Sequence, residues 1–143
     1  MSQSKKVLSR RGPSPTAKQL VEVAKAVGHP ARLRILAMLA DRSLCVCQMT
    51  ALLALAPSTV SGHLNELRRS GLVAEDKQGK LVFYRLAASG PFAGLLARAL
   101  SVVQGDQVIA ADRALLDRVQ AVPIEVLTRS GMDLQRVGIK RPR

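Results

Sequence analysis

The apolar residues between positions 16 and 70 recur every three to four residues, the spacing that gathers them on one face of an α-helix. Thr16 is a candidate N-cap and Gly28 a candidate helix stop, so a first helix is predicted between them. Further helices are predicted at about 30–40, 45–53 and 57–70. The amino-terminal half of the chain is therefore expected to be helical.

The pattern changes after position 71. Residues 72–74 and 81–86 are strand-like, and the polar segment between them predicts a β-hairpin with a basic tip. One long helical pattern then runs from 91 to about 119, with Gly105 as a candidate kink, and 123–129 is a candidate short helix. We expect a mainly α-helical fold with one small β-hairpin, in the order α-α-α-α-β-β-α.

Three segments are distinguished along the chain. Residues 1–15 form a basic arm with a Gly-Pro-Ser-Pro sequence at its end, and this arm either contacts DNA phosphates or is a solvated tail. Residues 16–120 are expected to form a winged helix-turn-helix domain for DNA binding and dimerisation. Residues 121–143 are a basic C-terminal extension, for which the sequence indicates no role.

The charge balance points to a polyanionic partner. Lysine and arginine outnumber aspartate and glutamate by 22 to 10, which gives a net charge of +12, and nucleic acid is the commonest partner of such a chain. No apolar run approaches the ~20 residues of a membrane span, and no signal-peptide pattern follows the basic N-terminus. We therefore expect a cytoplasmic protein without a membrane partner.

The predicted fourth helix has the features of a DNA-reading helix. Val60, Leu64 and Leu67 form an apolar stripe, while the other face carries short hydrogen-bonding side chains suited to base edges and phosphates. An ordinary solvated surface helix is the alternative, and His63 is as readily a packing or phosphate contact as a base contact. The candidate DNA contacts are Ser58, Thr59, Ser61, Gly62, His63, Asn65 and Arg68 on the helix, with Lys77, Lys80 and Arg85 on the hairpin.

Three segments resemble the ArsR/SmtB family of metal-responsive repressors. The sequence GHPARLRIL at 28–36 is similar to the family's second helix, residues 58–73 to its recognition helix and residues 79–86 to its wing. The resemblance spans roughly 18–118 and implies a homodimer, formed through the first and last core helices, that releases double-stranded operator DNA when an inducer binds. His29 stands where the family usually has an acid, which we interpret as a change of capping or local charge.

Cys45 and Cys47 are the candidate metal or metalloid site. The sequence SLCVCQM at 43–49 resembles the third-helix motif of the family's sensors for trivalent arsenic and antimony, and for cadmium and lead. Thiolates favour such soft ions. Residues i and i+2 of a helix point about 200° apart, so we expect both sulfurs to reach one ion only if the first helical turn is distorted. Unwinding of that turn would then move the recognition helix.

Missing residues narrow the choice of effector. The resemblance implies further cysteines on the N-terminal arm in the cadmium and lead sensors, and histidine ligands on the last helix in the zinc sensors, and this chain has neither. The third cysteine of the arsenic sensors is replaced by Thr50. A trivalent arsenical or antimonial is therefore the expected effector: arsenite, antimonite or methylarsenite, the last of which needs only two sulfurs. No resident cofactor is expected.

Other interpretations remain open for the same residues. The alternatives to an arsenical site are that Cys45 and Cys47 are small buried hydrophobic residues, ligands for cadmium or lead, or a redox sensor oxidised through sulfenic acid. A disulfide across one residue is unfavourable inside a helix. The alternative to a sensing repressor is a DNA-binding protein that tolerates many sequences and has no sensor. An enzyme is not expected, because the two histidines lie in different segments and no carboxylate pair is evident.

Overall fold

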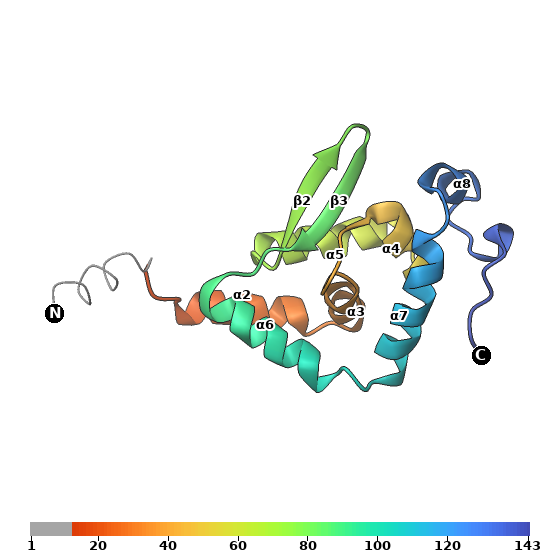
Figure 1. The fold of residues 1–143 in the computed structure, drawn as a ribbon. Helices are drawn as coiled ribbons and strands as arrows, with labels where there is room; N and C mark the ends of the chain where they lie inside the picture. The colour runs from red at the N-terminus through yellow and green to blue at the C-terminus, as the bar shows by residue number, and fades with distance from the viewer. Residues whose placement is uncertain (1–12) are drawn as a thin grey trace, which may run out of the picture.

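The computed structural model describes residues 13–143, so the predicted basic arm at 1–15 lies almost entirely outside the described residues. Figure 1 shows helices around a central core, with one hairpin projecting from it. The helices are α2 (Ala17–Val27), α3 (Pro30–Met38), α4 (Val46–Leu53), α5 (Pro57–Arg69), α6 (Gly90–Val102), α7 (Gln107–Gln120), α8 (Ile124–Arg129) and the 3-10 helix η1 (Gln135–Val137). The strands are β1 (Leu44–Cys45), β2 (Val73–Gln78) and β3 (Leu81–Leu86).

The first four predicted helices are confirmed. The hairpin is confirmed as well, although β2 continues to Gln78, through residues that were predicted to belong to the connection. α2 begins at the predicted N-cap, where the Thr16 hydroxyl accepts a hydrogen bond from the backbone N–H of Gln19 and the Gln19 side chain accepts one from the Thr16 N–H. α3, α4 and α5 pack around Ile35, Leu52 and Leu64, each fully buried. The apolar periodicity thus correctly identified the core of a winged helix-turn-helix.

Strand β1 was not predicted. It is two residues long and pairs antiparallel with β3, so that Leu44 lies opposite Tyr84 and Cys45 opposite Phe83. The sheet therefore has three strands in the order β1-β3-β2. As a result, the first cysteine of the candidate sensing site lies on a strand that is hydrogen-bonded to the wing.

The single helix predicted over 91–119 is wrong. The chain forms two helices, α6 and α7, that meet at an angle (Figure 1). The break has a local cause, because the Asp106 carboxylate accepts hydrogen bonds from the N–H groups of Val108 and Ile109 at 2.9 and 3.2 Å and so caps a new helix. The break lets α7 return to the core, where the Asp112 carboxylate accepts two hydrogen bonds from Arg34 of α3, at 2.7 and 2.9 Å.

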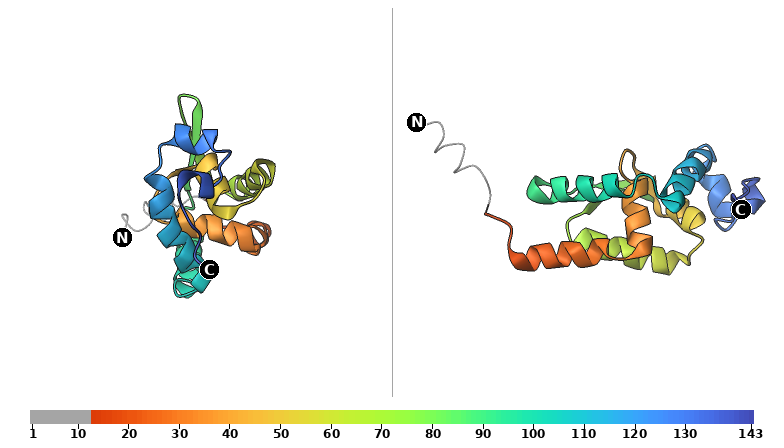
Figure 2. Two further views of the ribbon diagram at one scale, coloured as in Figure 1. Left: turned by 90° about the vertical axis from the view of Figure 1, so that its right-hand side faces the viewer. Right: turned by 90° about the horizontal axis from the view of Figure 1, so that it is seen from below.

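The C-terminal extension packs on the domain. In both views of Figure 2 it folds back beside α7, and α8 contacts α4. Three apolar side chains of the extension, those of Leu127, Leu134 and Ile139, are at most 4% exposed. The candidate helix at 123–129 is confirmed as α8. No helix within 13–143 has the length and apolar character that a membrane span requires.

Candidate DNA interface and thiol site

Helix α5 presents the predicted DNA-contacting residues on one exposed face. Its apolar stripe of Val60, Leu64 and Leu67 is fully buried, which fixes the rotation of the helix about its axis. A Cβ atom added at Gly62 would meet no heavy atom within 4 Å, so packing within the chain does not require glycine there. Of the predicted contacts on α5, Ser58, Thr59, Ser61, Gly62 and Arg68 are exposed, and His63 and Asn65 are half-buried.

Arg68 is already engaged within the protein. Its guanidinium donates a hydrogen bond to the Asn65 side-chain oxygen at 2.9 Å and lies 3.7 Å from the carboxylate of Glu75 on β2. Glu75 also accepts a hydrogen bond from the Tyr84 hydroxyl at 3.3 Å. These contacts connect the carboxyl-terminal end of α5 to the wing, so Arg68 holds the two elements together.

The two histidines, expected in different segments, pack against each other. The ring of His63 on α5 lies 4.5 Å from that of His29, centroid to centroid. His29 is the N-cap of α3, where its Nδ1 accepts a hydrogen bond from the Ala31 N–H at 3.1 Å, which supports the capping interpretation of this residue. Burial, followed by the positive charges of His29 and Arg32, lowers the pKa of His63 below its ordinary value of 6.5.

The hairpin places the three predicted basic residues at its exposed positions. Lys77, Lys80 and Arg85 are all exposed. Gly79 forms the turn with a φ of +63°, a conformation that favours glycine. Lys77 and Lys80 therefore lie at the tip and Arg85 nearer the base, as a wing that contacts the DNA backbone requires.

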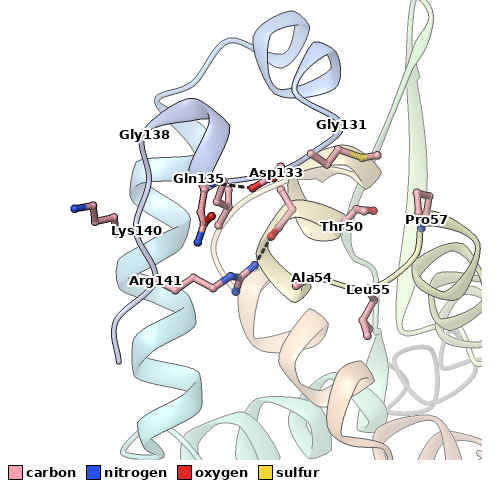
Figure 3. Close-up of a pocket in the computed structure, with 13 residues that line it drawn as sticks. Thr50, Ala54, Leu55, Pro57, Gly131, Asp133, Gln135, Gly138, Lys140 and Arg141 are labelled. Carbon is pink, nitrogen blue, oxygen red and sulfur yellow. Dashed lines mark hydrogen bonds between the residues drawn. The ribbon is translucent and has the colours of Figure 1, made fainter.

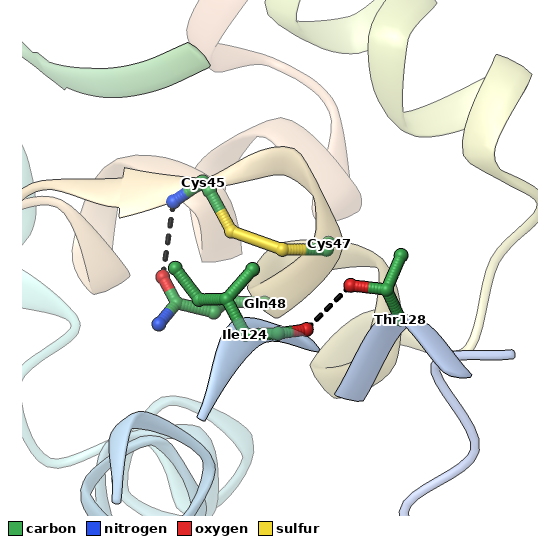
Figure 4. Close-up of a disulfide and its surroundings, with 5 residues drawn as sticks. All are labelled: Cys45, Cys47, Gln48, Ile124 and Thr128. Atoms are coloured by element: carbon green, nitrogen blue, oxygen red, sulfur yellow. Dashed lines mark hydrogen bonds between the residues drawn. A yellow bond between two sulfur atoms is a disulfide. The ribbon is translucent and has the colours of Figure 1, made fainter. Parts of the chain in front are cut away.

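The two cysteine sulfurs meet at the amino-terminal end of α4 (Figure 4). Cys45 is the N-cap of α4, with extended backbone (φ −83°, ψ 162°), and Cys47 is its second helical residue. The sulfurs form a disulfide, with the Cα atoms 5.4 Å apart. We expected both cysteines to lie within the helix. On that basis a bridge was unfavourable, and one ion would reach both sulfurs only after the helix unwound. This was wrong, because Cys45 precedes the helix.

The surroundings of the disulfide come from α4 and the C-terminal extension. The Cys45 N–H donates a hydrogen bond to the buried Gln48 side chain at 3.0 Å, which fixes the backbone before the helix. Ile124 and Thr128 of α8 lie next to the bridge (Figure 4). Cys45 is 2% exposed and Cys47 is half-buried, so a reagent from solvent reaches Cys47 first.

A third strong metal ligand does not join the two sulfurs. Within residues 13–143, no three histidine, cysteine, aspartate or glutamate side chains are grouped as a metal site requires. Thr50, at the position of the third cysteine in the resembling sensors, is 4% exposed and its hydroxyl has no hydrogen-bond partner among the described residues. Once reduced, the site offers two thiols.

Comparison with known proteins agrees with this architecture. The sequence profile of the bacterial regulatory protein, arsR family, matches residues 29–75. The transcriptional regulator CmtR of Mycobacterium tuberculosis is 38% identical over 97 residues, which cover 66% of this chain and 82% of CmtR. The chain belongs to the ArsR family. A transcriptional repressor SmtB homolog from Synechocystis is 39% identical over 71 residues, which cover half of this chain and 54% of that relative.

Solved structures of bacterial transcriptional regulators share the fold. Reduced HlyU from Vibrio cholerae aligns with a TM-score of 0.54 and 32% identity, covering 62% of this chain and 88% of HlyU. A homodimeric winged helix-turn-helix domain from Mycobacterium bovis aligns with a TM-score of 0.52 and 30% identity, covering 62% of this chain and 77% of that domain. The winged helix-turn-helix prediction is confirmed, and the relatives that resemble this ArsR-family chain are transcriptional regulators, not enzymes.

Proposed function

We propose that this ArsR-family protein is a homodimeric repressor that leaves its operator when a trivalent arsenical binds both Cys45 and Cys47. The observation that carries the proposal is the meeting of the two sulfurs before and within the first turn of α4. Two thiols satisfy methylarsenite, in which carbon already occupies one position of arsenic. Each thiol proton leaves with an arsenic-bound hydroxide as water, and two As–S bonds form.

Arsenite and antimonite are further candidates for the same site. Either ion would bind the two sulfurs and keep one hydroxide as its third ligand. Because the site has two thiols and no third strong ligand among residues 13–143, we expect methylarsenite to bind more tightly than arsenite. Cadmium and lead, which favour more sulfur ligands, are expected to bind more weakly still.

Cys45 is connected in two directions to the elements that are proposed to bind DNA. On one side, Cys45 pairs with Phe83 of β3, a strand of the wing. On the other side, α4 leads through residues 54–56 into α5, and these two helices pack on each other. A group bound between the sulfurs therefore displaces the wing and the recognition helix relative to each other, and α4 need not unwind for this to happen.

Exposed polar and apolar surfaces support the proposed DNA-bound dimer. The polar face of α5 enters the major groove, and Lys77, Lys80 and Arg85 of the wing contact the flanking backbone. Helices α2 and α6 each carry apolar side chains that are about half exposed or more, and a second copy of the chain would cover them. These are Leu20 at 48%, Val21 at 50%, Leu95 at 46% and Val102 at 71% exposed.

The test is release of a fluorescently labelled operator, followed by anisotropy. Reduced protein bound to DNA from its own promoter is titrated with methylarsenite, arsenite or antimonite, beside the Cys45→Ser/Cys47→Ser variant. We expect release from the wild type and none from the variant. Retention of the operator by the wild type at excess of all three would refute arsenical sensing and leave the DNA-binding assignment intact.

Thiol oxidation is the second candidate, favoured by the disulfide itself. A peroxide would oxidise the more exposed Cys47 to a sulfenic acid, and the Cys45 thiol would then displace water to form the bridge. In this case hydrogen peroxide releases the operator, dithiothreitol restores binding, and either single Cys→Ser variant is unresponsive. If the oxidised and reduced proteins bind the operator equally, the redox alternative is excluded.

A further inference from the structure

A large cavity lies between the helix-turn-helix and the C-terminal extension. It has a volume of about 830 Å³, within the range of roughly 300–1,000 Å³ that is typical of small-molecule sites. One wall is α4 and the turn into α5, and the other is the segment 131–141 (Figure 3). The cavity therefore spans the element that positions the recognition helix and the segment that had no predicted role.

The walls combine an apolar surface with two basic residues, Lys140 and Arg141, and the Lys140 side chain points away from α4 (Figure 3). Leu55, Pro57, Met132 and Leu134 are among the cavity's apolar lining residues. The guanidinium of Arg141 points into the cavity toward α4 (Figure 3). A ligand for this cavity would thus have an apolar body and a group that pairs with a guanidinium.

Arg141 has hydrogen-bonding capacity to spare. It donates to the carbonyl oxygens of Ala51 and Leu52, at 2.6 and 2.8 Å, at the carboxyl end of α4. A guanidinium has five N–H donors, and no carboxylate of residues 13–143 pairs with this one. The lining acid, Asp133, lies beside Arg136 at 3.6 Å. The cavity therefore has a net positive character.

Thr50 belongs to the α4 wall, but its hydroxyl does not face the cavity. It lines the cavity from α4, it is only 4% exposed, and its hydroxyl lacks a hydrogen-bond partner in the described chain. The hydroxyl oxygen itself is closed off from the cavity, so the observed ligand-facing groups are the apolar side chains and the guanidinium of Arg141.

We propose that this cavity binds a small amphipathic organic anion, a carboxylate on an apolar chain or ring, and that this ligand is a second effector of the regulator. Carboxylates match the guanidinium fork of Arg141 in charge and geometry. Because the ligand touches Leu55 and Pro57 in the turn into α5, its binding changes operator affinity, and operator binding changes ligand affinity by the same factor. The inference goes beyond the thiol chemistry, since neither cysteine lines the cavity.

Binding is tested with octanoate as the probe and the methionine methyl groups as reporters. In protein labelled with ¹³C at these methyls, the Met132 signal, assigned with Met132→Leu, is expected to shift saturably with octanoate. The signal of Met38, which is buried elsewhere and does not line the cavity, is expected to stay in place. Neutral octanol is the control for charge. An unshifted Met132 signal, or equal binding of octanol and octanoate, would overturn the proposal.

A matched pair of variants tests the anionic class. Arg141→Gln removes the positive charge and keeps donors for the carbonyl groups of α4, whereas Arg143→Gln removes the same charge two residues away, outside this cavity. We expect Arg141→Gln to weaken octanoate binding about threefold or more, the effect of losing one exposed ion pair. Arg143→Gln should bind octanoate like the wild type. Equal affinities of the two variants would contradict a role for Arg141.

The regulatory part is tested on the operator. Saturating octanoate is expected to change the operator Kd at least about twofold, in the wild type and in the Cys45→Ser/Cys47→Ser variant alike. A Met132 shift without any change in operator Kd would refute the effector role. Because the cysteine variant keeps this response, failure of arsenical release and failure of the anion site give different results.

Discussion

The packing of the C-terminal extension gives a quantitative prediction through Leu127. This side chain of α8 is fully buried in the same core as the helix-turn-helix. Replacing it with alanine removes apolar carbons that contribute about 0.8 kcal/mol each, or about 2.5 kcal/mol together. The cavity that remains adds to this loss. We expect Leu127→Ala to lower the free energy of unfolding by about 2–4 kcal/mol.

The control variant lies one residue earlier on the same helix. Val126 is 45% exposed, so Val126→Ala should cost less than about 1 kcal/mol. Urea unfolding followed by far-UV circular dichroism suits a chain without tryptophan. All variants are compared at one protomer concentration, because the stability of the proposed dimer would depend on it. If the two variants lose equal stability, the extension does not pack on the core as described.

Two further predictions concern an ion pair and a titrating histidine. Asp112→Ala leaves the guanidinium of Arg34 unpaired and should lower the free energy of unfolding by about 1–3 kcal/mol. Asp117→Ala, which removes an exposed ion pair, should lower it by less than about 1 kcal/mol. Equal losses of stability in urea unfolding would contradict the bidentate contact. Because the folded protein lowers the pKa of His63, protons bind the unfolded chain more readily, and stability is lost as pH falls below about 6.5. The thermal unfolding midpoint of the wild type should therefore fall between pH 7.5 and pH 5.5, and that of His63→Gln should fall less. If the two midpoints fall in parallel over this pH range, His63 does not contribute to the pH dependence of stability.

Periodicity predicted the elements long enough to show it. The helices of the helix-turn-helix contain several repeats of their apolar pattern, and β3 is a continuous apolar run apart from Arg85, so the sequence located them. β2 is apolar only at Val73 and Ala74, and its polar part was predicted as the connection of the hairpin. Strand β1 has two residues, too few for an alternation to repeat. Its omission placed Cys45 in a helix, and the geometry of the candidate thiol site was predicted wrongly for that reason.

Two other features depended on local signals that the apolar pattern masks. The helical spacing continues across 103–106, where Gly105 was a candidate kink, and the cap formed by Asp106 starts a separate helix there. The buried residues Leu127, Leu134 and Ile139 have no common period, because Gly131 and Gly138, at φ values of +71° and +79°, turn the chain between them. The packing of the extension therefore required the structure.

Simultaneous measurement of thiol occupancy and DNA release tests the central proposal most directly. Reduced protein bound to labelled operator would receive one equivalent of methylarsenite per chain, with anisotropy and intact mass recorded on the same sample. We predict that the operator is released in proportion to the adduct with one arsenic per chain, and that the Cys45→Ser/Cys47→Ser variant shows neither adduct nor release. A chain fully loaded with arsenic at Cys45 and Cys47 that still holds its operator would contradict the proposal.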